Sequence, residues 1–254
     1  MTNKVLDFFE DSAKSGEWNS LYHSDNPANY PFIIRIKKTL ELLENIQNKN
    51  VCDLGCGTGA LISPILEKQA IYTGIDFSNE MLETIKSKYP NEVLNKKINL
   101  ILINFGKDKF EKKFDLLIGL GFIEYFNEPQ KIINQLYNLL PKDGELILSF
   151  PNKNSLDFTM IRALSIIRYL VKKIFNIGKV NPPRKMWSRF EAKKILESEG
   201  FKIMKIKNYY FNILAYPFTK LLPRISFFLS KKLEYSPLCK INFFTNGFII
   251  SAKK

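Results

Sequence analysis

The stretch that decides the fold is VCDLGCGTG, residues 51–59, where three glycines occupy five positions directly behind Asp53 and Leu54. An apolar strand that ends in glycines and continues as a helix presents backbone N–H groups and the positive end of a helix dipole to a ligand. A side chain at Gly55 or Gly57 would hold that ligand away from the main chain. The stretch therefore predicts a strand–loop–helix site that contacts its ligand through the backbone.

Two kinds of nucleotide-binding loop compete for this stretch. The G-x-G-x-x-G/A loop of nicotinamide enzymes can be placed on Gly55, Gly57 and Ala60. That loop seats a pyrophosphate, which the carboxylate of Asp53 would repel. The same carboxylate would attract a ligand that carries an ammonium and a sulfonium group. Asp53 therefore favours a positively charged ligand over a pyrophosphate.

Strands and helices alternate in the pattern expected along the chain. Strands are expected at residues 49–54, 70–76, 98–103, 114–118, 145–150, 201–207 and 241–252. Helices are expected at residues 32–45, 58–68, 79–88, 128–140, 160–175 and 189–199, and Ser78 is the expected N-cap of the third. This alternation predicts an α/β fold with a mostly parallel sheet and helices on both faces.

Four motifs in order resemble those of the class I S-adenosylmethionine-dependent methyltransferases. The D-x-G-x-G-x-G motif of that family is matched by Asp53, Gly55, Gly57 and Gly59, and the acid that ends its second strand is matched by Asp76. The stretches FDLLIG and LPKDGELILS, residues 114–119 and 140–149, are similar to its fourth strand and to its turn into the fifth. The resemblance implies a Rossmann-like sheet of about seven strands and S-adenosylmethionine as the cofactor.

The resemblance also implies a set of cofactor contacts. The methionine part would lie on the glycine loop, which comprises Gly55, Cys56, Gly57, Thr58 and Gly59. Asp53 would lie near the ammonium group, and Asp76 would accept hydrogen bonds from both ribose hydroxyls.

The adenine part is expected beyond the second and third strands. Asn104 and Phe105 stand where relatives often have an acid that reads the adenine amine, and an Asn amide can both accept from that amine and donate to a ring nitrogen. Phe77 and Met81 are expected against the base, with ordinary core packing as the alternative for both.

The acceptor is expected over the loop GLGFIEYF, residues 119–126. Gly119 and Leu120 are expected to contact the cofactor, and Phe122 is expected to contact the acceptor. Glu124 and Tyr125 replace the Glu-His pair of many small-molecule relatives and are candidate catalytic residues.

An N-terminal arm folds over the cofactor in relatives, which brings further candidates to the acceptor. His23, the chain's only histidine, is a candidate catalytic residue, and Tyr22 and Tyr30 are candidate acceptor contacts together with Arg35. The alternative for these arm residues is a solvated surface position. Cysteines 52 and 56 lack a second pair of metal ligands, so no metal is expected.

Charge divides the chain into two parts. Residues 1–150 carry 17 Lys and Arg against 20 Asp and Glu, whereas residues 151–254 carry 21 against 5. The expected organisation is an arm and helix (1–47), a cofactor-binding core (48–151), a lid insertion (152–187), a core helix and strand (188–210), a second lid insertion (211–240) and a last core strand (241–254). Both insertions combine basic with apolar residues, which suits a lid over an apolar cavity, an anionic membrane surface or a solvated lysine-rich face.

Location follows from the absence of export and membrane signals in the sequence. Acids stand where a signal peptide would have its apolar core, uncharged runs reach only about a dozen residues, and three cysteines make no disulfide framework. A cytoplasmic protein is expected, with peripheral contact to the inner face of the membrane through the basic lid. The sequence does not indicate an oligomeric state.

The sequence predicts a methyltransferase that acts on a small, apolar or lipid-linked acceptor, with O-methylation favoured over N-methylation. Two alternatives stay open: an RNA-modifying methyltransferase that uses the basic C-terminal part, and a non-catalytic binding module of the same fold. The Asn/Asp-Pro-Pro-aromatic motif of nucleic-acid amino-methyltransferases is missing from residues 119–126, which argues against the first. The intact acidic and glycine motifs argue against the second.

Overall fold

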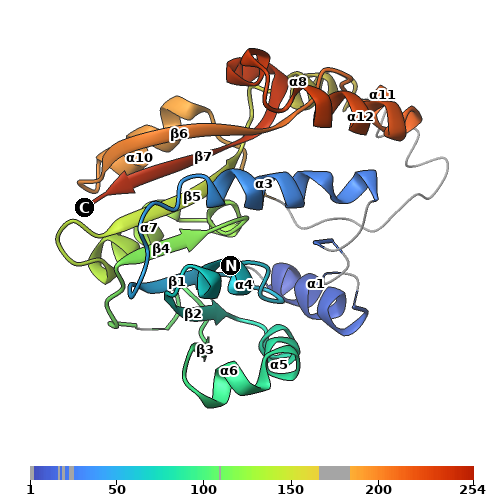
Figure 1. Cartoon of the computed structure of the whole chain (residues 1–254). Helices are drawn as coiled ribbons and strands as arrows, with labels where there is room; N and C mark the ends of the chain where they lie inside the picture. The colour runs from blue at the N-terminus through green and yellow to red at the C-terminus, as the bar shows by residue number, and fades with distance from the viewer. Residues whose placement is uncertain (1–2, 17, 19–20, 23–25, 109, 166–183) are drawn as a thin grey trace.

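One seven-stranded sheet organises the protein. The computed structural model describes residues 3–16, 18, 21–22, 26–108, 110–165 and 184–254 (Figure 1). The sheet order is β3-β2-β1-β4-β5-β7-β6. The strands are β1 (Asn50–Leu54), β2 (Ile71–Asp76), β3 (Ile98–Leu102), β4 (Leu116–Gly119), β5 (Glu145–Pro151), β6 (Lys202–Phe211) and β7 (Thr245–Lys253). Strands β1 to β5 pair in parallel and β7 runs antiparallel to both its neighbours, so the predicted mostly parallel sheet is confirmed.

Helices cover both faces of the sheet, as the alternating pattern predicted. One face packs against α7 (Pro129–Leu139) and α10 (Arg189–Glu197), which contribute Leu136 and Leu196 to the core. The other face packs against α3 (Tyr30–Leu40), α4 (Ile62–Glu67) and α5 (Asn79–Lys88), through Ile34, Ile65 and Ile85 among others. The remaining helical elements are α1 (Asn3–Lys14), η1 (Pro27–Asn29), α6 (Pro90–Leu94), η2 (Ile123–Tyr125), α8 (Leu156–Ala163), α11 (Phe218–Leu221), α12 (Pro223–Leu233), η3 (Pro237–Lys240) and η4 (Asn242–Phe244).

Several expected boundaries differ from the structure: α3 ends at Leu40 rather than at residue 45, and β6 continues to Phe211 rather than ending at residue 207. Helix α4 starts at Ile62 rather than at residue 58, because Gly59 has φ +80° and lies outside helical conformation. Strand β7 starts at Thr245, because the 3-10 turn η4 occupies residues 242–244, which were expected to belong to it. Of the helix expected at residues 160–175, α8 contains the first four, and residues 166–183 lie outside the described part of the chain.

The second insertion gathers with α8 at one end of β6 and β7 (Figure 1). Asp157 of α8 accepts a hydrogen bond from the backbone N–H of Tyr216 at 2.8 Å. Glu234, which follows α12 and is completely buried, accepts from the backbone N–H groups of Tyr210 and Phe211 at 3.2 and 2.7 Å. These bonds fix the insertion to the sheet and to the segment that leaves β5.

Candidate active site

The glycine loop follows β1 and turns back over β2. Its three motif glycines Gly55, Gly57 and Gly59 all have positive φ, at +68°, +52° and +80°. Residues with a Cβ rarely adopt this conformation, so the spacing of the glycines is a backbone requirement. The N–H groups of Gly55 and Cys56 donate to the carbonyl of Ile75 at 2.8 and 3.1 Å, which holds the loop against the end of β2.

Asp76, the last residue of β2, lies directly against that loop. Its Oδ2 accepts a hydrogen bond from the N–H of Gly57 at 2.9 Å, and its Oδ1 accepts from the N–H of Ser78 at 3.0 Å. Burial raises the pKa of Asp76, while the N–H groups of Ser78, Gly57 and Phe77 oppose that rise. Ser78 also caps α5 by accepting from the N–H of Met81 at 3.4 Å, which confirms the predicted N-cap.

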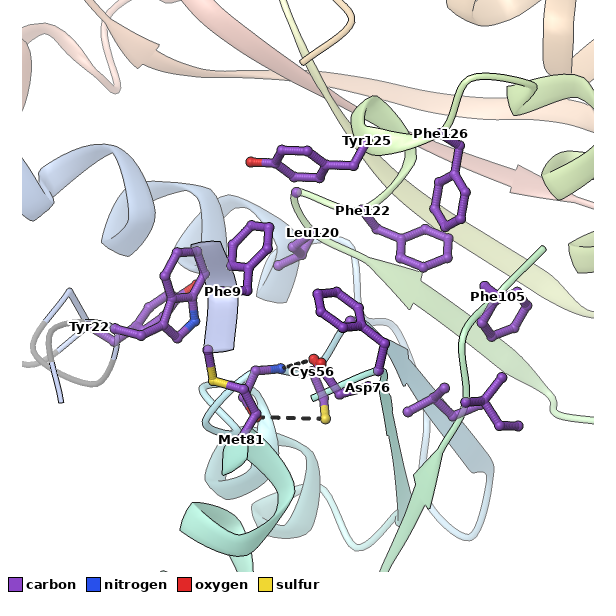
Figure 2. A pocket seen from close by; sticks show the side chains of 17 residues that line it. Phe9, Tyr22, Cys56, Asp76, Met81, Phe105, Leu120, Phe122, Tyr125 and Phe126 are labelled. Atoms are coloured by element: carbon purple, nitrogen blue, oxygen red, sulfur yellow. Dashed lines mark hydrogen bonds between the residues drawn. The ribbon is translucent and has the colours of Figure 1, made fainter. Parts of the chain in front are cut away.

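A pocket of about 670 Å³, partly open to solvent, lies above the loop (Figure 2). Asp76 and Met81 lie on one side, and Phe122, Tyr125 and Phe126 lie on the other. Eleven of the side chains and glycines assigned from the sequence line it: Tyr22, Gly55, Cys56, Gly57, Asp76, Phe77, Met81, Phe105, Leu120, Phe122 and Tyr125. Among the lining residues in the described part of the chain, Asp76 alone carries a charge.

An aromatic cluster from the N-terminal arm closes one side of the pocket. The ring of Phe9, on α1, meets those of Trp18, Phe77 and Tyr125 edge to face, at centroid distances of 5.0, 6.0 and 5.3 Å. The indole of Trp18 lies so close to Gly57 that a Cβ there would come within 2.8 Å of its Nε1. The arm thus packs directly on the glycine loop.

Sequence reasoning missed several lining residues. They are Phe9, Trp18, Ile75, Ile103, Gly121 and Phe126. The buried positions Val5, Phe9 and Ser12 of α1 recur at helical spacing, which was a usable signal that one face of the arm packs on the core. No spacing in the sequence indicates that Trp18 reaches the glycine loop.

Asp53 lies beneath the loop rather than on the pocket wall. It is buried, and its Oδ2 accepts a hydrogen bond from the hydroxyl of Tyr72 at 2.8 Å. Burial raises the pKa of Asp53 to about 7, against the lowering effect of the Tyr72 bond. A cation that reached this carboxylate would lower that pKa again.

Asn104 also lies behind the wall, between the lining residues Ile103 and Phe105. Its backbone N–H donates to Asp108 at 2.8 Å, but its buried side-chain Oδ1 has no hydrogen-bond partner among the described residues. An orphaned buried acceptor is costly, which makes this oxygen a candidate to accept a hydrogen bond from a ligand.

A buried charged group backs the acceptor side of the pocket. The guanidinium of Arg35 packs against Gly121, where a Cβ would lie 2.9 Å from Nη1. Glu124 is buried, and its Oε2 has no hydrogen-bond partner among the described residues. Burial raises the pKa of Glu124, and the positive charges of Arg35 and Arg184 offset only part of that rise. Burial and the charge of Glu124 raise the pKa of Tyr125, so this lining phenol keeps its proton at neutral pH.

The remaining assigned residues do not share the pocket wall. The predicted residues Thr58, Gly59, Gly119 and Glu124, like Asp53 and Asn104, are not among its lining residues. Tyr30 packs its ring edge to face against Phe227 of α12 and Tyr210 of β6, at 5.2 and 6.1 Å, and so joins the arm to the second insertion. His23 lies outside the described residues.

Two features are absent from the described residues. No group of three or more His, Cys, Asp or Glu side chains is arranged to hold a metal ion. No helix in the described part of the chain is long and apolar enough to cross a membrane.

Known proteins resemble this chain in sequence and in fold. A family model described as a methyltransferase domain matches residues 52–146. The ubiquinone biosynthesis O-methyltransferase of Coxiella burnetii is 24% identical over 181 residues, which cover 67% of this chain and 74% of that protein. The protein of the same name from Glaesserella parasuis is 29% identical over 173 residues, which cover 66% of this chain and 71% of that protein. The magnesium protoporphyrin IX methyltransferase of Synechocystis PCC 6803, solved with bound S-adenosylhomocysteine, superposes with a TM-score of 0.70 at 18% identity over all of both chains.

Proposed function

This chain belongs to the class I S-adenosylmethionine-dependent methyltransferases, and we propose that it methylates an oxygen of a small apolar or lipid-linked acceptor. The acceptor class, the methylated atom and the residue roles given below are parts of that proposal. The observation that carries it is the pocket wall, which combines one carboxylate at the glycine loop with aromatic side chains elsewhere.

Residues on the pocket wall and directly behind it suit three parts of the cofactor. Asp76 offers a buried carboxylate to the ribose, next to a loop that leaves no side chain at Gly55 and Gly57. The orphaned Oδ1 of Asn104 offers an acceptor to the adenine amine. The buried guanidinium of Arg35, behind Gly121, offers a countercharge to the methionine carboxylate, and Asp53 offers one to the ammonium group.

Methyl transfer from this cofactor needs alignment more than activation, because its sulfonium supplies a methyl group that is already reactive. The chain's task is to hold the acceptor oxygen in line and to exclude water. Phe9, Trp18 and Tyr22 of the arm, with Phe122 and Phe126 opposite, form a mostly apolar enclosure suited to that task.

An aromatic or quinol-like acceptor suits this enclosure better than a polyanion. Among the lining residues of the described chain there is no Lys or Arg, and Arg35 is buried behind Gly121, so a phosphate backbone would find no exposed countercharge at the pocket. The relatives named above support the same acceptor class, since those from both bacteria are named for O-methylation in ubiquinone biosynthesis.

Oxygen as the methylated atom is supported by the groups beside the acceptor loop. A hydroxyl acceptor must lose its proton, and a buried carboxyl with a raised pKa, such as Glu124, is suited to receive it. Tyr125, which keeps its proton, can donate a hydrogen bond to the acceptor oxygen. His23 remains a candidate base from the arm.

The test is transfer of radiolabelled methyl from S-adenosylmethionine to a panel of catechols, quinol analogues, aromatic amines and RNA. The proposal expects label on phenolic hydroxyls, a strongly reduced kcat for Glu124→Gln and a smaller reduction for Tyr125→Phe. Label on RNA or on amines alone would overturn it. A full rate for both variants would remove Glu124 and Tyr125 from the proposal and leave alignment as the only contribution.

A further inference from the structure

Helix α12 buries two serines and exposes two large apolar side chains, which is the reverse of an ordinary surface helix. Its buried positions are Ser226 and Ser230, at 5% and 2% exposure, whereas Ile225 and Phe228 are 51% and 62% exposed. A surface helix usually buries its apolar stripe and exposes its polar one. Phe227 is half-buried and packs against the core, but the core does not explain Ile225 and Phe228.

The exposed apolar positions continue beyond α12 as one face. Phe218 and Leu221 of α11 and Leu222 at the junction are exposed as well, at 53%, 69% and 42%. We call this surface the insertion face. It comprises Phe218, Leu221, Leu222, Ile225 and Phe228.

The exposed charges of the second insertion itself have one sign. Exposed basic residues accompany the insertion face within the second insertion: Lys220, Arg224, Lys231, Lys232 and Lys240. Between residues 200 and 254 the only acidic residue is Glu234. That carboxyl is completely buried and bonded to the backbone of β6, so it does not offset the surface charge.

The other side of α12 ties the insertion face to the arm that covers the pocket. Phe227 packs edge to face on Tyr30 at 5.2 Å, and α12 contacts both η1 and β6. Figure 1 shows α11 and α12 at the outer end of the molecule, beside α8. A surface that held the insertion face would therefore lie close to the elements that enclose the acceptor.

We propose that the insertion face lies on an anionic lipid bilayer, with its apolar residues in the headgroup region and its Lys and Arg side chains on the acidic lipids. Exposed apolar side chains at helical spacing beside an excess of basic residues are the pattern of helices that lie in a membrane interface. A nucleic acid would use the charge but not the apolar residues. The proposal deepens the proposed function by naming the source of a lipid-linked acceptor, and only that link rests on the proposed function.

The experiment measures co-sedimentation of the full chain with vesicles of phosphatidylcholine alone and of phosphatidylcholine with phosphatidylglycerol. The test variant is Ile225→Ser with Phe228→Ser. Its matched control is Leu94→Ser with Phe190→Ser, which removes two apolar residues that are 80% and 74% exposed elsewhere. We expect binding to the anionic vesicles, a loss of at least about tenfold in partition coefficient for the test variant, and no change for the control.

A second pair of variants separates charge from apolar contact. Arg224→Glu with Lys232→Glu should lower binding by about fivefold for each positive charge removed, and high salt should have a parallel effect. Lys107→Glu with Lys142→Glu makes the same change of net charge away from the insertion face and should have a smaller effect. Circular dichroism establishes that each variant is folded.

Three outcomes would overturn the proposal. Wild-type chain that stays in the supernatant, or a test variant that binds vesicles like the wild type, would exclude the insertion face. Binding that depends on charge and salt alone would assign the face to RNA or an acidic protein surface. Methyl transfer to a water-soluble phenol, measured on the same samples, tests the proposed function separately: its absence with intact vesicle binding would refute that function and leave the docking surface in place.

Discussion

Replacing Gly57 by alanine tests the glycine loop, because two separate costs can be worked out from the structure. The first is conformational. Gly57 has φ +52°, and a non-glycine residue in that region costs about 1–2 kcal/mol. That cost should appear as a lower free energy of unfolding.

The second cost falls on ligand binding. Gly57 lines the pocket, and its Cβ would lie 2.8 Å from Nε1 of Trp18. The indole must then move, and the methyl group occupies space that the ligand needs; overpacking of this kind costs about 1–3 kcal/mol. A value near 2 kcal/mol corresponds to a loss of about 30-fold in cofactor affinity.

Gly200→Ala is the matched control, because Gly200 has φ +97° and lies outside the pocket lining, where its Cβ would meet Tyr137 at 3.1 Å. Denaturant unfolding should give similar losses of stability for both variants. Isothermal calorimetry with S-adenosylhomocysteine should give weaker binding for Gly57→Ala only. Equal affinity of Gly57→Ala and wild type would refute the reasoning, and so would an equal loss of affinity in both variants.

Three further predictions concern the same pocket. Asp76→Asn should weaken cofactor binding by at least about tenfold in calorimetry, because hydrogen bonds to charged groups contribute about 1.5–3 kcal/mol; unchanged affinity would remove the ribose role. Burial raises the pKa of Asp53 to about 7, so affinity for a ligand with an ammonium group should rise as pH increases through that value and the carboxyl ionises. Asp53→Asn should bind more weakly with a flat profile over the same range, and a wild-type affinity independent of pH would contradict the pairing. Phe9→Ala removes the ring that meets Trp18, Phe77 and Tyr125 and should raise the KM for the cofactor more than it lowers kcat. Phe8→Ala, which leaves the pocket lining intact, is its control, and equal KM values for the two variants would show that the arm does not cover the cofactor.

The shift at Asp53 also affects stability, with a definite sign. Its pKa rises from 3.8 to about 7 on folding, so protonation favours the folded state. The contribution is complete below the unfolded pKa and is lost as pH rises through about 7. Between about pH 4 and pH 7, the free energy of unfolding should therefore depend less on pH in Asp53→Asn than in the wild type.

The sequence predicted the parts of the fold that depend on local backbone chemistry. The positive φ angles of Gly55, Gly57 and Gly59 require glycine at these positions. Asp76 at the end of β2 accepts a hydrogen bond from the same loop, which explains why an acid stands there. Apolar segments were enough to place the five parallel strands β1 to β5 to within two residues, because a buried parallel strand must be apolar. The antiparallel strands β6 and β7 each differ by four residues at one end.

Contacts between distant segments could not be predicted in the same way. Phe9 reaches Tyr125 across more than a hundred residues, and nothing in its neighbourhood indicates that partner. Tyr30 was expected at the acceptor but packs against Phe227 and Tyr210, since the aromatic side chain of an arm residue suits either position. The apolar stripe of α12 would normally predict burial, and only the structure places its serines inside.

The central claim is that the pocket above the glycine loop binds S-adenosylmethionine through Asp76. Isothermal calorimetry of the purified chain with S-adenosylmethionine and S-adenosylhomocysteine, beside the Asp76→Asn variant, tests it most directly. We expect one site per chain with micromolar affinity in the wild type and a clear loss of affinity in the variant. Absence of binding of both ligands to the folded wild-type chain, or equal binding by the variant, would contradict it.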